Sequence, residues 1–171
     1  MSFKEINVCD IDSNVFEMIG KQWMLVTAKK EDKVNTMTAS WGGFGVMWGK
    51  NVAYIVIRPQ RYTKEFIDSS DTLSLTFFGE EYRKMLSYMG TTSGRDEDKI
   101  KKSGLIVEYD GETPYFSEAE VVLKARKLYA DEIKEGSFID KSLTDKWYKN
   151  VEKEGYHILY ICEIEKVLVK G

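Results

Sequence analysis

The 171-residue sequence predicts a single domain, residues 1–171, of mainly β structure with a few short helices. Three observations support this fold class. Several stretches are rich in β-branched or aromatic residues and alternate apolar with polar positions, as strands do. The helical patterns are short. Apolar residues make up 43% of the chain, which is enough for a substantial core. The four clearest strand patterns are Trp23–Ala28, Asn51–Arg58, Thr72–Phe78 and His157–Val169.

The N-terminal region predicts one short helix followed by a hairpin. Asp12 or Ser13 can cap a helix over Asp12–Ile19, with Val15, Phe16 and Ile19 on its apolar face and Gly20 as its end. Trp23–Ala28 is then a strand. The charged turn Lys29–Lys33 leads back into a second strand at Val34.

The stretch Val34–Gly49 begins as this strand and is expected to end as a loop rich in glycine and aromatic residues. In an extended chain, Asn35, Met37, Ala39 and Trp41 lie on one side, opposite Thr36, Thr38 and Ser40. Both sides offer groups that a ligand can use, which favours the floor of a site for a flat ligand with polar edges. The alternative is a half-exposed strand that leads into a flexible hairpin loop.

Two later segments combine a helix start with basic residues. Asn51–Arg58 is a buried strand that Pro59 closes, and Thr63 can cap a helix to about Ser69, so Arg58 and Arg61 lie just before that helix. Free amides, a helix dipole and guanidinium groups form phosphate sites, although two solvated arginines beside a cap are the alternative. The polar turn Thr91–Lys99 opens a second short helix to about Lys102 and repeats this feature.

Between and after these segments the pattern is less uniform. Thr72–Phe78 is a strand with one buried face, and Glu81–Tyr88 is an amphipathic helix that ends at Gly90. Ala119–Ile133 favours a helix by propensity, yet Val121, Leu123 and Ala125 alternate as in a strand. Lys141–Glu154 is charged and is expected to be irregular or partly helical, before the last strand His157–Val169.

Composition argues against several functional classes. The net charge of −3 disfavours nucleic acid or an anionic membrane as a partner. No apolar run is long enough to span a bilayer and no signal peptide is visible, so a cytoplasmic protein is expected. Two cysteines and one histidine leave too few residues for a disulfide framework or a His- or Cys-based metal site. A serine triad lacks its Gly-x-Ser-x-Gly motif.

Taken in order, several short motifs resemble the flavin reductase-like family of FMN-binding split barrels, which includes flavoredoxin. The ordered set is more specific than any one motif, and it extends from about Gln22 to Val169. The matching motifs are Asn35–Gly43, Arg58–Thr63, Phe78–Gly79, Ser93–Lys99 and Gly155–His157.

The resemblance implies an antiparallel Greek-key split β-barrel with small flanking helices, in which Glu120–Lys127 is a strand. It also implies a homodimer with FMN near the subunit interface. Asn35 and the residues from Met37 to Trp41 would lie along the ring system and ribityl chain, and His157 at the pocket rim. Arg58, Arg61 and Thr63 would approach the phosphate. The expected FMN-binding residues are Asn35, Met37, Thr38, Ala39, Ser40, Trp41, Arg58, Arg61, Tyr62, Thr63, Ser93, Gly94, Asp96, Lys99 and His157.

The function implied is that of an FMN-binding redox protein without a catalytic acid or base from a side chain. A flavin reductase would take hydride from NAD(P)H, whereas a flavoredoxin-type carrier would exchange electrons with a redox protein. The residues would also fit a flavin-binding module without turnover, or a plain structural barrel. Two departures from the family stand out: no cysteine lies near Ala125, and the segment from Gly136 to Glu154 is longer than usual.

A cluster of large apolar residues supports the expected homodimer independently of the resemblance. Trp41, Phe44, Met47 and Trp48 crowd the glycine-rich stretch, where a surface loop would leave them exposed. A second copy of the chain would bury these residues. The alternative is that the loop folds back over its own barrel.

Overall fold

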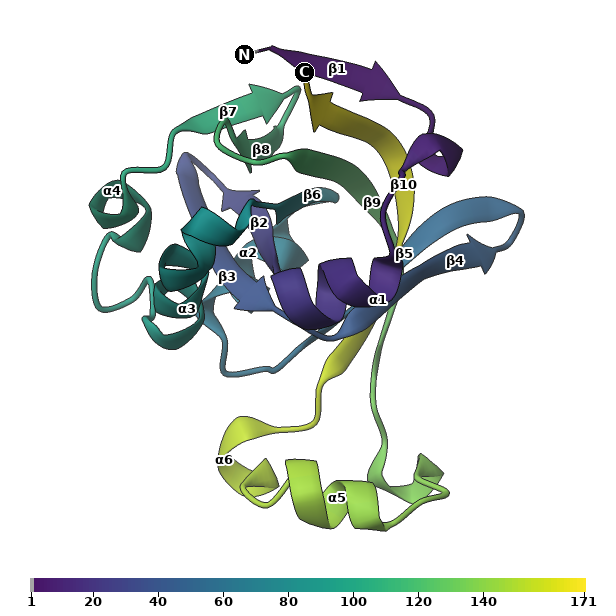
Figure 1. Ribbon diagram of the computed structural model, residues 1–171. Coiled ribbons are helices and arrows are strands. Elements are labelled where there is room, and N and C mark those ends of the chain that lie inside the picture. Colours follow the sequence, from purple (N-terminus) through teal and green to yellow (C-terminus); the bar gives the residue numbers. More distant parts are fainter. Residues whose placement is uncertain (1) are drawn as a thin grey trace.

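The structure is a computed structural model that describes residues 2–171 and is mainly antiparallel β (Figure 1). The strands are β1 (Phe3–Ile6), β2 (Met24–Lys30), β3 (Lys33–Ala39), β4 (Gly42–Met47), β5 (Lys50–Ile57), β6 (Thr72–Phe77), β7 (Val107–Asp110), β8 (Thr113–Phe116), β9 (Val121–Glu132) and β10 (Ile158–Lys170). The α-helices are α1 (Val15–Glu17), α2 (Tyr62–Ser69), α3 (Arg83–Thr91), α4 (Lys99–Ser103), α5 (Ser142–Trp147) and α6 (Val151–Glu154). Helical turns of the 3₁₀ or π type are η1 (Val8–Asp10), η2 (Met18–Gln22), η3 (Glu80–Tyr82) and η4 (Glu135–Ser137).

One curved sheet forms a barrel that does not close. Its strand order is β3-β2-β6-β9-β10-β5-β4, and every neighbouring pair is antiparallel. β1 pairs with the C-terminal part of β10, and β7 and β8 form a separate hairpin. The two edge strands, β3 and β4, are consecutive in the sequence, so the chain itself crosses the opening. The antiparallel split barrel expected from the resemblance is confirmed.

The two faces of the sheet pack against different groups of apolar residues. Alternate side chains of a strand point to opposite faces. On β2, Met24 and Val26 therefore join the cluster inside the barrel, together with Leu75 of β6. Leu25 joins a second cluster with Leu86 and Met89 of α3. This second cluster fixes α3 next to β3, at the open edge of the barrel.

The ambiguous segment is a strand, as the resemblance implied. β9 pairs with β6 over Val121–Arg126 and with β10 along its whole length. A strand with partners on both edges satisfies its backbone groups on both sides, and this pairing outweighs the helix propensity of its residues.

The glycine-aromatic stretch, which was expected to be a loop, is the regular strand β4. It pairs with β5 from Gly42 to Met47, and its glycines explain why. A Cβ atom at Gly42 would lie 2.3 Å from the backbone oxygen of Tyr54, and the Tyr54 ring lies beside Gly43 and Gly45. The glycines therefore allow β4 to approach β5 closely. Within this stretch Phe44 packs on the barrel core, whereas Met47 and Trp48 are exposed.

The helix caps also differ from the expectation. Asn14, rather than Asp12 or Ser13, caps the first helix, which continues past Gly20 to Gln22 as η2. Phe16 is 87% exposed and does not face the core. Thr63 lies inside α2 rather than at its cap position, which Arg61 occupies. Gly90 lies within α3, which ends at Thr91.

Residues 133–157 leave the barrel as one excursion, which we call the excursion segment. Its two ends are adjacent, because Glu132 of β9 pairs with Ile158 of β10. Between them, η4, α5 and α6 extend away from the body of the barrel, as the yellow-green part of Figure 1 shows. Across residues 2–171, no helix has the length and apolar character needed to cross a membrane.

Candidate functional site

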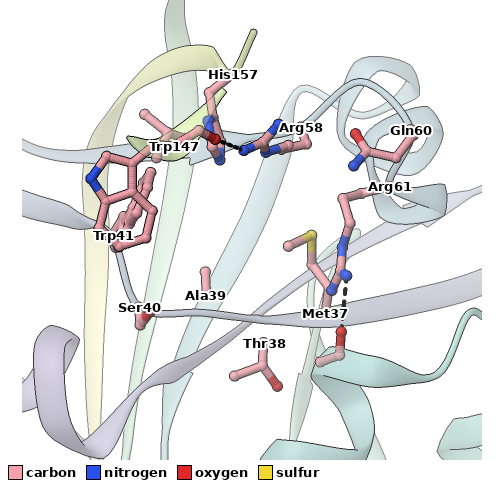
Figure 2. Close-up of a pocket in the computed structure, with 12 residues that line it drawn as sticks. Met37, Thr38, Ala39, Ser40, Trp41, Arg58, Gln60, Arg61, Trp147 and His157 are labelled. Carbon is pink, nitrogen blue, oxygen red and sulfur yellow. Dashed lines mark hydrogen bonds between the residues drawn. The ribbon is translucent and has the colours of Figure 1, made fainter. Parts of the chain in front are cut away.

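Two adjoining pockets lie at the open edge of the barrel. The larger has a volume of about 380 Å³ and the smaller about 190 Å³. They share Met37, Gln60 and Arg61, so they form one elongated site with two ends. The larger pocket is also lined by Thr38, Ala39, Ser40, Trp41, Val56, Arg58, Gly90, Trp147 and His157 (Figure 2). The smaller is also lined by Asn35, Tyr62, Thr63, Thr91, Thr92, Ser93, Gly94 and Lys99.

β3 forms the floor of both pockets. Met37 and Ala39 project toward the larger pocket in Figure 2, while Thr38 points the other way. The Thr38 hydroxyl donates a hydrogen bond to the backbone oxygen of Leu86 on α3, at 2.5 Å. Because β3 is an edge strand, β2 is its only sheet partner within residues 2–171. An edge strand leaves a row of backbone N–H and C=O groups without sheet partners, and such groups can bind the polar rim of a flat ligand.

Aromatic side chains from distant segments form one wall of the larger pocket. Trp41, at the end of β3, packs edge to face with Trp147 of α5 at 4.9 Å between ring centroids. On Trp41 also packs the ring of His157, at 5.1 Å between ring centroids. His157 is 9% exposed, and its Nδ1 atom shares a hydrogen bond of 2.8 Å with the Tyr148 hydroxyl. Burial, together with the charge of Arg58, lowers the pKa of His157 to about 4, so this imidazole is neutral at pH 7.

The smaller pocket carries two positive charges that have no carboxylate partner within the described part of the chain. Arg61 donates to the backbone oxygen of Gly90 at 2.9 Å. Lys99 is 3% exposed, and its Nζ atom donates to the backbone oxygens of Met89 and Thr92, both at 2.8 Å. Burial lowers the pKa of Arg61, although arginine stays protonated. Burial and the nearby Arg61 lower the pKa of Lys99 to about 8. An anion in this pocket would relieve the repulsion between the two cations.

The start of α2 adds hydrogen-bond donors to the same pocket. Arg61 is the N-cap residue, and its side chain makes no capping hydrogen bond. The amide of Lys64 donates to the backbone oxygen of Arg61 at 3.0 Å, so the amides without a cap at the start of α2 are those of Tyr62 and Thr63, and the helix dipole favours an anion there. The Thr63 hydroxyl, which was expected to cap α2, instead accepts a hydrogen bond from Asn35 Nδ2 at 2.9 Å. This bond ties β3 to α2 across the smaller pocket.

A close contact with Asn35 explains why residue 94, in the polar turn Thr91–Lys99, is a glycine. A Cβ atom at Gly94 would lie 2.3 Å from Asn35 Oδ1, so a larger residue would displace the asparagine. Ser93 and Gly94 both line the smaller pocket. Asp96 is exposed and lines neither pocket. Arg95 turns away to Glu65, at 2.6 Å.

The structure separates the two arginines that the sequence placed together. Arg61 borders both pockets, whereas Arg58 lines the larger pocket only and binds the excursion segment. Of the expected residues, all except Asp96 line one or both pockets.

Sequence reasoning also missed several pocket residues. Gln60 lies within a recognised motif and could have been included. Trp147 had only its position in a charged segment as a signal. The missed residues are Val56, Gln60, Gly90, Thr91, Thr92 and Trp147.

Solved structures with the same fold come from flavin-binding proteins. A crystal structure of an FMN-binding domain of a flavin reductases-like enzyme from Shewanella baltica has a TM-score of 0.70 and 13% identity, covering 98% of this chain and 77% of that one. The flavoredoxin of Methanosarcina acetivorans has a TM-score of 0.68 and 21% identity, with coverages of 96% and 76%. An NADH:FAD oxidoreductase of Streptomyces globisporus, in complex with NAD and FAD fragments, has a TM-score of 0.64 and 11% identity, with coverages of 87% and 74%.

The family assignment rests on the sequence. A comparison with curated proteins gives no match. The family model described as "Flavin reductase like domain" matches residues 17–171, which is most of the chain and includes every residue of both pockets. The chain therefore belongs to the flavin reductase-like domain family.

Proposed function

We propose that this protein binds FMN across the two pockets and acts as a flavin reductase-like oxidoreductase. It would take hydride from a reduced nicotinamide nucleotide and pass electrons to an acceptor. One observation carries the proposal: Arg61 and Lys99, two partly or fully buried cations without a carboxylate partner within residues 2–171, lie at one end of a pocket large enough for a ring system. Family membership and the names of the structural neighbours support a flavin as the ligand.

The two pockets match the two ends of FMN. A terminal phosphate carries up to two negative charges at neutral pH, which two cations and the start of α2 would balance. The larger pocket, with Met37 and Ala39 on its floor, would take the flat ring, and the free edge of β3 would meet the ring's polar rim. The ribityl chain would pass Gln60, where the pockets meet.

The side chains of this protein would bind and orient the cofactor rather than transfer protons. Bound FMN would supply the hydride and electron chemistry. The neutral His157 ring and the Trp41–Trp147 pair would exclude water from one side of the ring. No ionised acid or base is needed for these roles.

A flavoredoxin-type electron carrier is the second candidate function, and a flavin-binding module without turnover is a third. The likeness to a flavoredoxin of the same fold favours the carrier. The reductase and the carrier use the same FMN site and differ only in the electron donor.

We also propose that the protein is a homodimer. At the β4–β5 hairpin, Val46 is 71% exposed and Trp48 is 60% exposed, with Met47 between them. Adjacent exposed apolar residues on a hairpin favour contact with another protein surface. A twofold arrangement of two hairpins would bury these side chains.

The first prediction concerns the phosphate. FMN should bind the protein at least about tenfold more tightly than riboflavin, because a charge-assisted hydrogen bond contributes about 1.5–3 kcal/mol. Arg61→Ala should weaken FMN binding by about tenfold and leave riboflavin binding unchanged. The apo melting temperature should hardly change, because Arg61→Ala loses one hydrogen bond to Gly90 but also removes the repulsion between Arg61 and Lys99. Flavin fluorescence quenching measures both affinities.

Arg126→Ala is the matched control for Arg61→Ala. Arg126 has the same charge but pairs with Glu163 and Glu165 on the barrel surface, away from both pockets. Its removal should leave the affinity for both flavins unchanged. Equal affinities of the wild type for FMN and riboflavin would contradict the phosphate assignment.

The second prediction is a pH dependence. In the free protein, Lys99 has a pKa of about 8, so it loses its charge as the pH rises through 8. A bound phosphate stabilises the charged form and raises this pKa, so binding takes up a proton above pH 8. FMN affinity should therefore be flat from pH 7 to 7.5 and fall about fivefold between pH 8 and pH 9. The affinity for riboflavin should not fall in this way between pH 8 and pH 9. The affinity of Lys99→Met for FMN should not do so either.

The third prediction separates the reductase from the carrier. Under anaerobic conditions, NADH or NADPH should bleach the flavin absorbance of the FMN-loaded protein within seconds to minutes, faster than it reduces free FMN. The rate is measured by stopped-flow absorbance. If neither nucleotide reduces the bound flavin but a reduced redox protein does, the carrier is the better assignment.

The fourth prediction concerns the homodimer. Trp48→Glu should shift sedimentation toward the monomer, because a charge is costly in an apolar interface. Ile106→Glu is the control, since Ile106 is also 60% exposed but lies before β7, away from the hairpin. A wild-type protein that sediments as a monomer at micromolar concentration while holding one FMN per chain would rule out the dimer.

A further inference from the structure

Arg58 makes all of its side-chain hydrogen bonds and its ion pair with the excursion segment. Its Nη2 atom donates to the backbone oxygen of Trp147 at 2.6 Å, and its Nη1 atom donates to that of Gly155 at 3.3 Å. Nη1 also lies 2.9 Å from Glu154 Oε2. The guanidinium group therefore connects the end of β5 to α5, to α6 and to the return of the chain toward β10.

Two further contacts hold the same junction. The Arg58 guanidinium lies 5.0 Å from the centre of the Tyr148 ring, and Tyr148 in turn hydrogen-bonds His157. Gly155 lies so close to Pro59 that a Cβ atom there would be 2.8 Å from the proline ring. Pro59, the residue after Arg58, therefore packs against the excursion segment at Gly155, and Arg58 hydrogen-bonds to the backbone of the same segment.

The charge on Arg58 is compensated by a carboxylate, unlike the charges of the smaller pocket. Glu154 and two carbonyl oxygens already compensate Arg58. Arg61 and Lys99 have carbonyl partners but no carboxylate among the described residues. Arg58 also lines only the larger pocket. A phosphate would gain little from a guanidinium group that is already paired.

The position of Trp147 depends on this junction. Its backbone oxygen is bound by Arg58, and its indole packs edge to face against Trp41 while lining the larger pocket. Figure 2 shows the guanidinium of Arg58 pointing toward Trp147 across the top of the pocket. Without Arg58, the Trp41–Trp147 contact and the Tyr148–His157 hydrogen bond would have to hold the end of α5 in place.

We propose that Arg58 is a positioning residue that fastens the excursion segment to the barrel, so that Trp147 walls the larger pocket, and that it is not a phosphate ligand. This inference rests on the proposed function only for the identity of the ligand. The two roles predict different losses. A phosphate ligand affects FMN but not riboflavin, whereas a wall beside the ring affects both flavins equally, because they share the ring.

The experiment compares Arg58→Ala with the wild type by two measurements. The first is limited trypsin digestion of the apo protein, analysed by mass spectrometry. The excursion segment holds several lysines, and their cleavage in Arg58→Ala should be at least about tenfold faster, because local opening becomes easier when charge-assisted bonds are lost. Cleavage within the barrel should be as slow in Arg58→Ala as in the wild type. Arg126→Ala, with the same change in charge, should be cleaved at the wild-type rate.

The second measurement is the titration of FMN and of riboflavin. Arg58→Ala should weaken both by the same factor, so that the wild-type preference for FMN is preserved, and Trp147→Ala should do the same. Arg61→Ala should instead reduce the preference by about tenfold. If Arg58→Ala abolishes the preference for FMN and leaves the digestion unchanged, Arg58 is a phosphate ligand and the proposal is wrong.

A milder variant covers the case in which Arg58→Ala fails to fold. Glu154→Gln removes the ion pair and leaves Arg58 in place, so it should speed digestion of the excursion segment by a smaller factor without changing the preference for FMN. A wild-type rate of digestion in Glu154→Gln would count against the proposal. If the wild type binds neither flavin, the proposed function fails, and the digestion alone still decides whether Arg58 holds the excursion segment.

Discussion

The pairing of β10 with three other strands is the constraint on which the rest of this structure depends. β9 covers one edge of β10 along nearly its whole length, and β5 and β1 share the other edge. On the other edge of β9 lies β6, which pairs in turn with β2, and β2 pairs with β3. β10 therefore joins the side of the sheet that holds β9, β6, β2 and β3 to the side that holds β5 and β4. The same pairing brings the two ends of the excursion segment together and sets its direction.

The site follows from the way the barrel stays open. Six antiparallel pairings in a row separate β3 from β4 around the sheet, yet only two residues join them in the chain. The free edge of β3 is therefore exposed at the point where α2, α3 and the excursion segment meet. A closed barrel would have used the backbone groups of β3 within the sheet. The open edge keeps them available for a ligand.

Electrostatics divides this site into two ends. At the larger end, His157 is neutral and Arg58 is paired with Glu154, so Arg61, where the two pockets meet, is the cation there without a carboxylate partner among the described residues. At the smaller end, burial holds Lys99 and Arg61 close together without a carboxylate among the described residues. Two like charges in a partly dry pocket destabilise each other, and a bound anion would offset this cost. A polar ligand with one charged end and one flat end fits this division.

The sequence by itself determined the β class, the positions of β2, β3, β5, β6 and β10, and many of the residues that line the two pockets. These features depend on local periodicity, on glycine and proline, and on short ordered motifs, which neighbouring residues carry. It could not decide that β9 is a strand without the family resemblance, because its residues favour a helix until β6 and β10 pair with them. It predicted a loop at Gly42–Met47, where close packing on Tyr54 makes a strand. Only the tertiary structure separated Arg58 from Arg61. The two residues have the same chemistry and lie three positions apart, but a turn after β5 points one toward the excursion segment and the other toward Lys99. Which groups surround a charge is decided by chain segments far away in the sequence, and short-range patterns do not contain that information.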